Sequence, residues 1–191
     1  MDTIQLAVQA YILSLTPQPQ NASQDQRPAN NPPPQRLQLL ADGKAVPSLW
    51  TEPQIKSAFV IANQVWSQAS IEFVPITIST RCDAVPADED GMWIYFINHL
   101  SPRAGLAVGF VYDLPSDEGG WGGGRIAIVG GAKAKNALEN YAGSVLAHEL
   151  GHVLFNSPEH DPSASNVMYG KRNPRIANAD RMDQAQIEKA R

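Results

Sequence analysis

Residues 147–154 read Ala-His-Glu-Leu-Gly-His-Val-Leu and include two of the chain's four histidines. On a helix, His148 and His152 stand one turn apart on the same face, so their imidazoles can converge on one metal ion while Glu149 flanks them. This spacing is typical of zinc hydrolases. The alternative is an amphipathic helix whose histidines only line its polar edge. We favour the metal site because three of the four histidines fall within residues 148–160.

A catalytic zinc site typically has three protein ligands and a fourth position for water. The nearby candidates for the third ligand are His160, Glu159 and Asp161. The chain must turn sharply after the helix to bring any of them back, and Asn156 and Pro158 favour such a turn. We predict His160 as the third ligand, because neutral imidazole suits zinc, with the Asp161 carboxylate orienting it. Glu159 and Asp161 remain the alternatives.

At these residues the chain resembles the metzincin clan of zinc metallopeptidases, most nearly its matrixin-like members. The resemblance rests on His148, Glu149, His152, His160, Asp161 and the downstream segment Asn166-Val167-Met168-Tyr169-Gly170, which is similar to the clan's Met-turn. The chain departs from the clan's extended motif at Phe155 and Pro158, where the clan has Gly and the third His. His160 therefore comes two residues later than in the clan.

The resemblance implies that Met168 forms a structural floor beneath the metal and is not a ligand. Tyr169 has two possible roles, stabilising an oxyanion or packing into the wall of the substrate pocket, and we favour packing. We expect a zinc-dependent endopeptidase in which Glu149 is the general base that activates water. The alternatives are a zinc hydrolase of a non-protein amide and a catalytically silent, peptidase-like binding module. The expected cofactor is Zn²⁺ and the expected partner is a protein or peptide substrate.

Composition places the chain among ordinary globular proteins, with 191 residues of which 43% are hydrophobic and 18% charged. The net charge of -4 gives no electrostatic reason to expect nucleic acid as a partner. No apolar run approaches the ~20 residues that a membrane span needs. We expect the protein to be a monomer.

The first residues lack the basic region of a cleavable signal peptide. We therefore expect a cytoplasmic protein, a protein exported by a leaderless route, or a domain of a larger protein. Cys82 is the only cysteine, so no intrachain disulfide is possible. Its setting between Arg81 and Asp83 resembles the thiolate latch of matrixin zymogens, but we favour a bystander side chain.

The predicted organisation has two parts, an N-terminal segment with a linker (1–35) and a metallopeptidase catalytic domain (36–191). Residues 1–15 are expected to form a short helix or a packed segment, and the Pro-, Gln- and Asn-rich residues that follow form the linker. The fold class is α+β and zincin-like: a twisted, mostly parallel sheet with an antiparallel edge strand, packed on the active-site helix and a second long helix, with a C-terminal helix. The opening order of strand, long helix and strand is also that of matrixin-like domains.

The pattern of apolar and turn residues predicts the individual elements. Strands are expected at 36–41, at 71–78 with a fault at Pro75, at 92–97 after an acidic loop (83–91), and at 108–114. Helices are expected after Thr51, which Gln54 helps to cap, at 134–154, and at 184–191, which Asp183 and Gln186 cap.

Residues 119–131 are rich in glycine but lack the Lys-Ser/Thr of a phosphate-binding loop. We predict instead a substrate-binding edge strand formed by Arg125, Ile126, Ala127, Ile128 and Val129, whose backbone would pair with an extended peptide. The acidic residues Asp113, Asp117 and Glu118 fit no defined calcium motif, and solvated loop charges are favoured. His99 is an isolated histidine that we leave out of the site.

Overall fold

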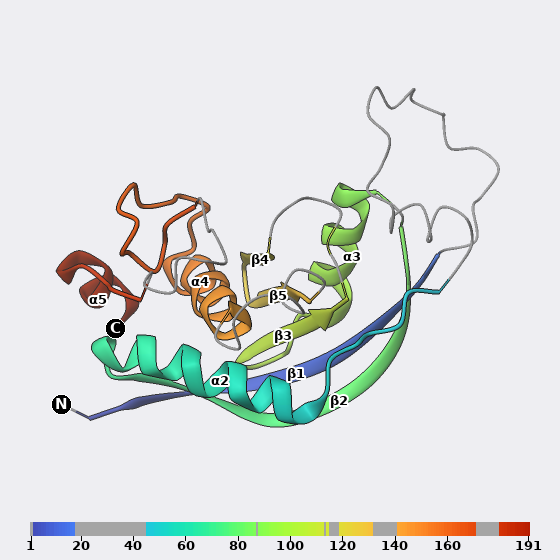
Figure 1. Ribbon diagram of the computed structural model, residues 1–191, viewed down its shortest axis with the longest axis horizontal. Coiled ribbons are helices and arrows are strands. Elements are labelled where there is room, and N and C mark those ends of the chain that lie inside the picture. The colour runs from blue at the N-terminus through green and yellow to red at the C-terminus, as the bar shows by residue number, and fades with distance from the viewer. Residues whose placement is uncertain are drawn as a thin grey trace.

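A computed structural model of the chain describes residues 2–17, 45–86, 88–112, 114, 119–131, 141–170 and 180–191. Five strands and four helices, with one short 3-10 turn, follow one another along these residues (Figure 1). They are β1 (Ile4–Pro17), α2 (Glu52–Trp66), η1 (Ser67–Ala69), β2 (Ile71–Val85), α3 (Glu89–Leu100), β3 (Leu106–Val111), β4 (Gly120–Gly123), β5 (Ile126–Gly130), α4 (Tyr141–Phe155) and α5 (Gln184–Ala190).

The strands form one sheet in the order β2-β1-β3-β5-β4. The pairs β2-β1, β1-β3 and β3-β5 are parallel, and β4 is antiparallel to β5. The predicted mixed fold with a mostly parallel sheet and an antiparallel edge strand is therefore confirmed. The residues predicted for this edge strand, 125–129, were wrong, because the antiparallel edge strand is β4.

The predicted edge strand, residues 125–129, lies inside the sheet. Ile126, Ala127, Ile128 and Val129 belong to β5 between β3 and β4, and all four are buried. Arg125 is exposed in the turn before β5, where its guanidinium donates to the backbone oxygen of Arg103. The actual edge strand reads Gly-Trp-Gly-Gly, a glycine-rich composition that strand propensity disfavours, so its sequence does not predict a strand.

Of the two forms expected for the N-terminal segment, a short helix and a packed segment, the structure supports the second, because the segment is a strand within the sheet. β1 lies between β2 and β3, and it contributes buried side chains to a core on each face of the sheet. Val8 and Ala10 point to one face of the sheet, whereas Leu13 and Leu15 point to the other. Residues 4–17 thus share the sheet of the predicted catalytic domain. The predicted division at residue 35 and the predicted strand 36–41 lie outside the described residues.

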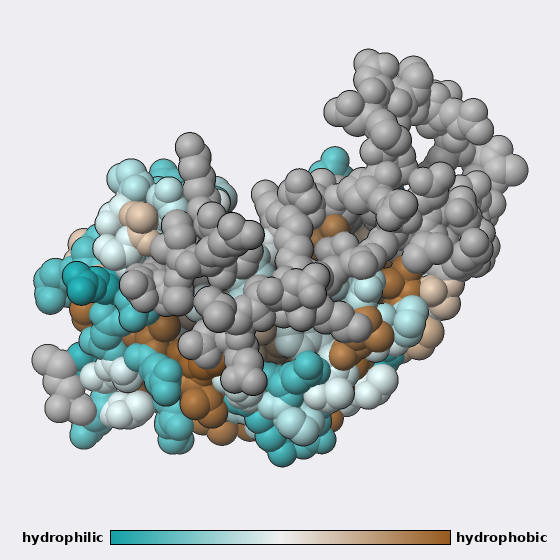
Figure 2. All heavy atoms as spheres, viewed as in Figure 1, coloured by the Kyte–Doolittle hydropathy of each residue, from teal (hydrophilic) through white to brown (hydrophobic). Residues whose placement is uncertain are grey.

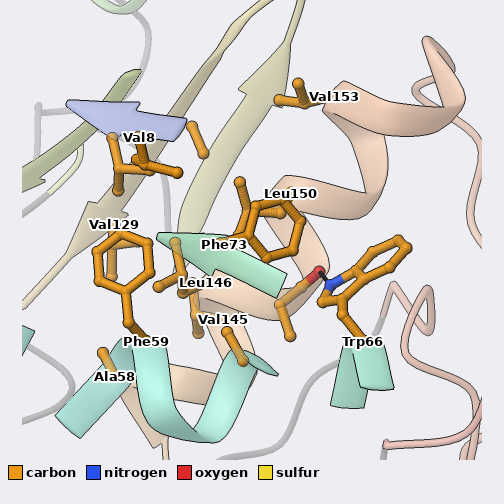
Figure 3. Close-up of a cluster of buried hydrophobic side chains, with 14 of the residues drawn as sticks. Val8, Ala58, Phe59, Trp66, Phe73, Val129, Val145, Leu146, Leu150 and Val153 are labelled. Atoms are coloured by element: carbon orange, nitrogen blue, oxygen red, sulfur yellow. Dashed lines mark hydrogen bonds between the residues drawn. The ribbon is translucent and has the colours of Figure 1, made fainter. Parts of the chain in front are cut away.

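Helices cover both faces of the sheet (Figure 1). α2 and α4 pack on one face in a core that includes Phe59, Phe73 and Leu146, which Figure 3 shows in close-up. The indole N–H of Trp66 donates to the backbone oxygen of Ala147 at 3.0 Å, which ties α2 to α4 beside the predicted metal ligands (Figure 3). α3 packs on the other face.

α2 begins where the sequence predicted. The side-chain oxygen of Gln54 accepts hydrogen bonds from the backbone N–H and the hydroxyl of Thr51, both at 2.9 Å. The predicted apolar stripe is buried: Ile55, Ala58, Phe59, Ala62, Val65 and Trp66. α2 approaches α4 closely, because a methyl group at Gly143 would lie 2.4 Å from Cβ of Ile61.

α3 replaces the strand predicted at 92–97, and the predicted acidic loop 83–91 is divided between the end of β2 and the start of α3. The Asp88 carboxylate caps this helix by accepting the backbone N–H of Gly91 at 2.7 Å. Met92, Phe96 and Leu100, four residues apart, are buried against the sheet. The local run of aromatic and β-branched residues favours a strand, but this helical spacing and the cap outweigh it.

β2 contains the fault predicted at Pro75. Val8 pairs with Pro75 and Gln9 with Thr77, so Ile76 is the extra residue of a bulge. β2 is also an edge strand, as a proline in a strand indicates, and it extends to Val85, beyond the predicted end.

The surface seen in Figure 2 mixes hydrophilic residues with smaller hydrophobic areas. The most exposed large apolar side chains are Val60, Ile76 and Ile94, which come from three separate elements, α2, β2 and α3. Scattered exposed side chains of this kind are normal on protein surfaces. Among the described residues, no helix combines the length and the apolar character that crossing a membrane requires.

Candidate metal centre

α4 carries the first three residues of the predicted site and is buried on nearly every side. His148, Glu149 and His152 are 4%, 6% and 6% exposed. Apolar side chains surround them along the helix, so the sheet, α2 and the C-terminal segment all pack against α4. Of the predicted helix 134–154, the structure describes the part from Tyr141, and the helix ends at Phe155.

The turn predicted after this helix is present. Asn156 has φ 46, in the left-handed region that asparagine tolerates. The N–H of Ser157 donates to the backbone oxygen of His152 at 3.3 Å, which closes the end of the helix. The reversal brings the chain back to α4, so that His160 lies beside His148 and His152.

Two backbone carbonyls orient the helical imidazoles. Nδ1 of His148 lies 2.7 Å from the oxygen of Val167, and Nδ1 of His152 lies 2.7 Å from the oxygen of Ser157. A carbonyl oxygen only accepts, so each Nδ1 carries the proton, and each neutral ring presents the lone pair of Nε2. The two Nε2 atoms are 3.0 Å apart.

His160 completes a cluster of three imidazoles. One ligand nitrogen from each of His148, His152 and His160 lies within 4.8 Å of the others. The His160 ring is nearly parallel to that of His148, with centroids 5.2 Å apart, and nearly perpendicular to that of His152, at 4.9 Å. The fold therefore brings together all three predicted ligands.

This donor set fits a zinc ion. Two Nε2 lone pairs 3.0 Å apart, with no proton between them, repel each other unless a cation lies between them. In a tetrahedral site with Zn–N bonds of about 2.0–2.1 Å, neighbouring ligand nitrogens are about 3.3–3.4 Å apart. The separation of the helical pair is close to this value. Neutral imidazole nitrogens also suit zinc chemically.

The alternative third ligands lie outside the cluster. Glu159 is exposed, and its backbone N–H donates to the hydroxyl of Ser157 at 3.2 Å. The Asp161 carboxylate accepts the backbone N–H of Ser163 at 2.7 Å. The expectation that Asp161 orients the His160 ring was wrong, because its carboxylate stabilises the following turn instead.

Met168 lies against the middle of α4, between the two helical histidines. It is 2% exposed, and a methyl group at Gly151 would lie 2.3 Å from its sulfur. The Asn166 side chain accepts the backbone N–H of Met168 at 2.8 Å and donates to Gln186 of α5 at 3.0 Å. The histidine cluster does not include Met168, and the role of Met168 as a floor stays a prediction. Tyr169 is half-buried, and its predicted role is likewise untested.

β4 packs directly on Glu149, and its glycines make this possible. A methyl group at Gly120 would lie 2.6 Å from Cγ of Glu149 and 2.9 Å from Oε1. At Gly122 it would lie 2.2 Å from the backbone oxygen of Glu149. Both glycines have ordinary backbone conformations, so the space they leave, and not their flexibility, is what the site uses.

Sequence reasoning missed two kinds of partner at this site. The carbonyls of Val167 and Ser157 are backbone groups that every residue carries, so residue types cannot predict their role at the site. The glycine-rich composition of residues 119–131 was noticed, but packing of these glycines against Glu149 was not predicted.

The N-terminus of α5 is capped by Asp183 and Gln186, as predicted. The Asp183 carboxylate accepts the N–H of Gln186 at 2.8 Å, and the Gln186 side chain accepts the N–H of Asp183 at 3.0 Å.

His99 and Cys82 lie on other elements. The His99 ring at the end of α3 stacks on Tyr95, with centroids 4.0 Å apart, and its Nδ1 lies 2.8 Å from the Tyr95 oxygen. Cys82 is exposed in β2. Asp113, Asp117 and Glu118, considered for calcium, lie outside the described residues.

A pair of charged residues on β2 lies beside α3. Arg81 forms an ion pair with the buried Asp83 carboxylate at 3.0 Å and donates a hydrogen bond to the backbone oxygen of His99 in α3 at 3.5 Å. Burial chiefly, and the charge of Asp83 next, raise the pKa of Tyr95, whereas the Arg81 guanidinium lowers it.

No protein-family profile matches the chain, and no curated protein sequence matches it either. Among solved structures, the fold is similar to archaemetzincin from Methanopyrus kandleri, with a TM-score of 0.55 and 13% identity over 98% of this chain and 93% of that one. A chain in a chaperone-substrate complex also matches, with a TM-score of 0.50 and 10% identity, but over only 33% of that chain. At such identities these comparisons establish a shared fold.

Proposed function

We propose that this chain is a zinc-dependent endopeptidase. The observation that carries the proposal is the convergence of His148 and His152 through Nε2 atoms 3.0 Å apart, while each opposite ring nitrogen is committed to a backbone carbonyl. His160 supplies the third imidazole. Three protein ligands leave one coordination position for water, which is typical of catalytic zinc and unlike a closed structural site.

His148, His152 and His160 would hold the ion. Zinc bound in this way is a Lewis acid that polarises a carbonyl group and lowers the pKa of a coordinated water toward ~7. The Val167 and Ser157 carbonyls keep the two helical rings in the tautomer that ligation needs, and they make those rings more basic ligands.

Glu149 is the proposed general base. It follows His148 directly on α4, and β4 confines its side chain through contacts at Gly120. The carboxylate would accept the proton of the attacking water and deliver it to the nitrogen of the departing amine. A purely structural metal site has no use for such a base, which favours an enzyme over a silent binding module.

The proposed substrate is an extended peptide that pairs with the outer edge of β4. Among the described strands β4 is the last of the sheet on this side, its inner edge pairs with β5, and one of its faces packs on Glu149. Backbone N–H and C=O groups on an edge strand bind an extended chain in a fixed orientation. A peptide bound there would lie beside the proposed base. Tyr169, in the predicted role of packing into the pocket wall, would contribute to side-chain preference.

The decisive experiment is to map cleavage sites in a diverse peptide mixture by mass spectrometry with the zinc-loaded protein. Glu149→Ala, at equal zinc content, should lose cleavage because the general base is gone, by a factor of about 10²–10⁴. Glu188→Gln is a matched control, since it neutralises an exposed carboxylate on α5.

Cleavage by the unmodified chain and by Glu188→Gln, but not by Glu149→Ala, would support the endopeptidase. Equal cleavage by Glu149→Ala would overturn the role of Glu149. No cleavage by any of the three, with zinc bound and the fold intact, would favour a non-protein amide substrate or a binding module.

A further inference from the structure

His160 is held differently from the two helical histidines. Its aromatic neighbours are the rings of His148 and His152. Within the part of the chain that the structure describes, no carbonyl is hydrogen-bonded to either of its nitrogens. It is also exposed, whereas the other two are buried. Among the described residues, a packing contact limits the position of this ring instead.

Gly170 supplies that contact. A methyl group at Gly170 would lie 2.6 Å from Cγ, 2.9 Å from Cδ2 and 3.0 Å from Cβ of His160. The α-carbon thus lies close against the imidazole, with no room for a side chain between them. Gly170 is not in the left-handed region, so another residue could adopt its backbone conformation. What this position requires is space.

Backbone pairing prevents the two segments from moving apart. Asp161 pairs with Tyr169 in a parallel bridge, and the N–H of Asp161 donates to the oxygen of Met168 at 2.9 Å. These residues adjoin His160 and Gly170 in the chain. The N–H of Tyr169 also donates to the oxygen of Asn166 at 3.1 Å, which tightens the turn before Gly170. An added methyl group must therefore displace the ring more readily than the backbone.

We propose that Gly170 is a positioning residue for the third metal ligand. It acts through His160, whose ring it supports, and it does not itself touch metal or substrate. This inference rests on the proposed function in one respect, that His160 is a zinc ligand. The inference gives Gly170 a role in metal affinity, although Gly170 belongs to no metal-ligand motif.

The test is the zinc affinity of Gly170→Ala, measured by competition with a chromophoric chelator. The displaced ring should weaken zinc binding by about 10–100-fold, the usual effect of removing a partner that orients a metal ligand. Gly124→Ala is the control, because that glycine has φ 58 and nothing within 4 Å of an added methyl group. Gly124→Ala introduces backbone strain without touching the site, so its zinc affinity should be unchanged.

A double-variant comparison separates ring displacement from general damage. In a His160→Ala background the ring is absent, so adding Gly170→Ala should change zinc affinity less than twofold. If Gly170→Ala alone fails to fold, the double variant should fold, because the clash has been removed. Failure of both would overturn the inference, since the space would then be needed for another reason.

The outcomes distinguish this inference from the proposed function. Zinc binding by the unmodified chain together with unchanged affinity in Gly170→Ala would overturn the role of Gly170 and leave the proposed function standing. No zinc binding by the unmodified chain would instead overturn the metal centre itself, and the inference with it.

Discussion

Substituting Gly120 by alanine tests whether β4 positions the proposed general base. The added methyl group would lie 2.6 Å from Cγ of Glu149 and 2.6 Å from the backbone oxygen of Ile128, whereas ordinary contacts begin near 3.4 Å. The shortfall is about 0.8 Å on each side, and the Ile128 oxygen belongs to the sheet and cannot yield easily. The Glu149 side chain must therefore move, or β4 must separate from α4.

The size of the effect follows from this displacement. Misplacing a catalytic group by about 1 Å can cost about 10²-fold in rate, which is about 2.7 kcal/mol of transition-state stabilisation. Overpacking should also lower the free energy of unfolding by about 1–3 kcal/mol. Zinc content should not change, because Glu149 is not among the three imidazole ligands.

The assay compares kcat/KM for a cleaved peptide with zinc content and thermal unfolding. Gly123→Ala is the matched control on the same strand, because its methyl group would meet only the edge of the Trp93 ring, at 3.3 Å. We expect Gly120→Ala to lose about 10²-fold in kcat/KM and Gly123→Ala to stay within a few-fold of the unmodified enzyme. Full activity of Gly120→Ala, or equal losses in both variants, would refute a positioning role for β4.

Three further predictions concern the rest of the molecule. Removing residues 1–17 deletes β1, an interior strand of the sheet. Its three largest buried aliphatic side chains alone contribute about 5–9 kcal/mol of apolar burial, against a typical total stability of about 5–15 kcal/mol. Cooperative thermal unfolding should therefore disappear, and its survival would contradict the sheet order. Met168→Leu should lower the free energy of unfolding by less than about 1.5 kcal/mol and leave zinc content and turnover nearly unchanged, so loss of turnover with fold and zinc intact would exclude a purely packing role. In ultraviolet titration, Asp83→Asn should lower the raised pKa of Tyr95, because it removes one of the two causes of the increase. Since Tyr95 ionises at higher pH when folded than when unfolded, its contribution to stability should be complete below pH ~10 and be lost as the pH rises through the folded pKa.

The elements that the sequence predicted correctly are those with local signals. The cap at Thr51 and the apolar spacing after it fix α2, and Asp183 with Gln186 fixes the start of α5. Asn156 marks the left-handed residue after α4, and Pro75 marks the bulge and the edge of β2. In each case the residue type determines the backbone geometry of its neighbours, so no knowledge of distant parts of the chain is needed.

The predictions were wrong where packing against distant parts of the chain determines the secondary structure. β1 is apolar on both faces because the sheet is covered on both sides, so it lacks the alternation that distinguishes a strand from a helix. α3 carries a run of residues, 92–97, with strand propensity, yet it packs as a helix. β4 is mostly glycine, and its close packing against Glu149 explains the glycines at 120 and 122.

The candidate site also has a part that local sequence predicts and a part that depends on tertiary packing. His148, Glu149 and His152 follow from helical spacing alone, and a sharp turn brings His160 within reach. Their orientation depends on groups that residue type cannot reveal: a carbonyl at Val167, another at Ser157, and the missing side chain of Gly170. A motif thus predicts which side chains carry out the chemistry, whereas the contacts that hold them in place come from distant backbone. It follows that substitutions at Gly120 and Gly170, outside any ligand motif, test the proposed chemistry as sharply as substitutions of the ligands.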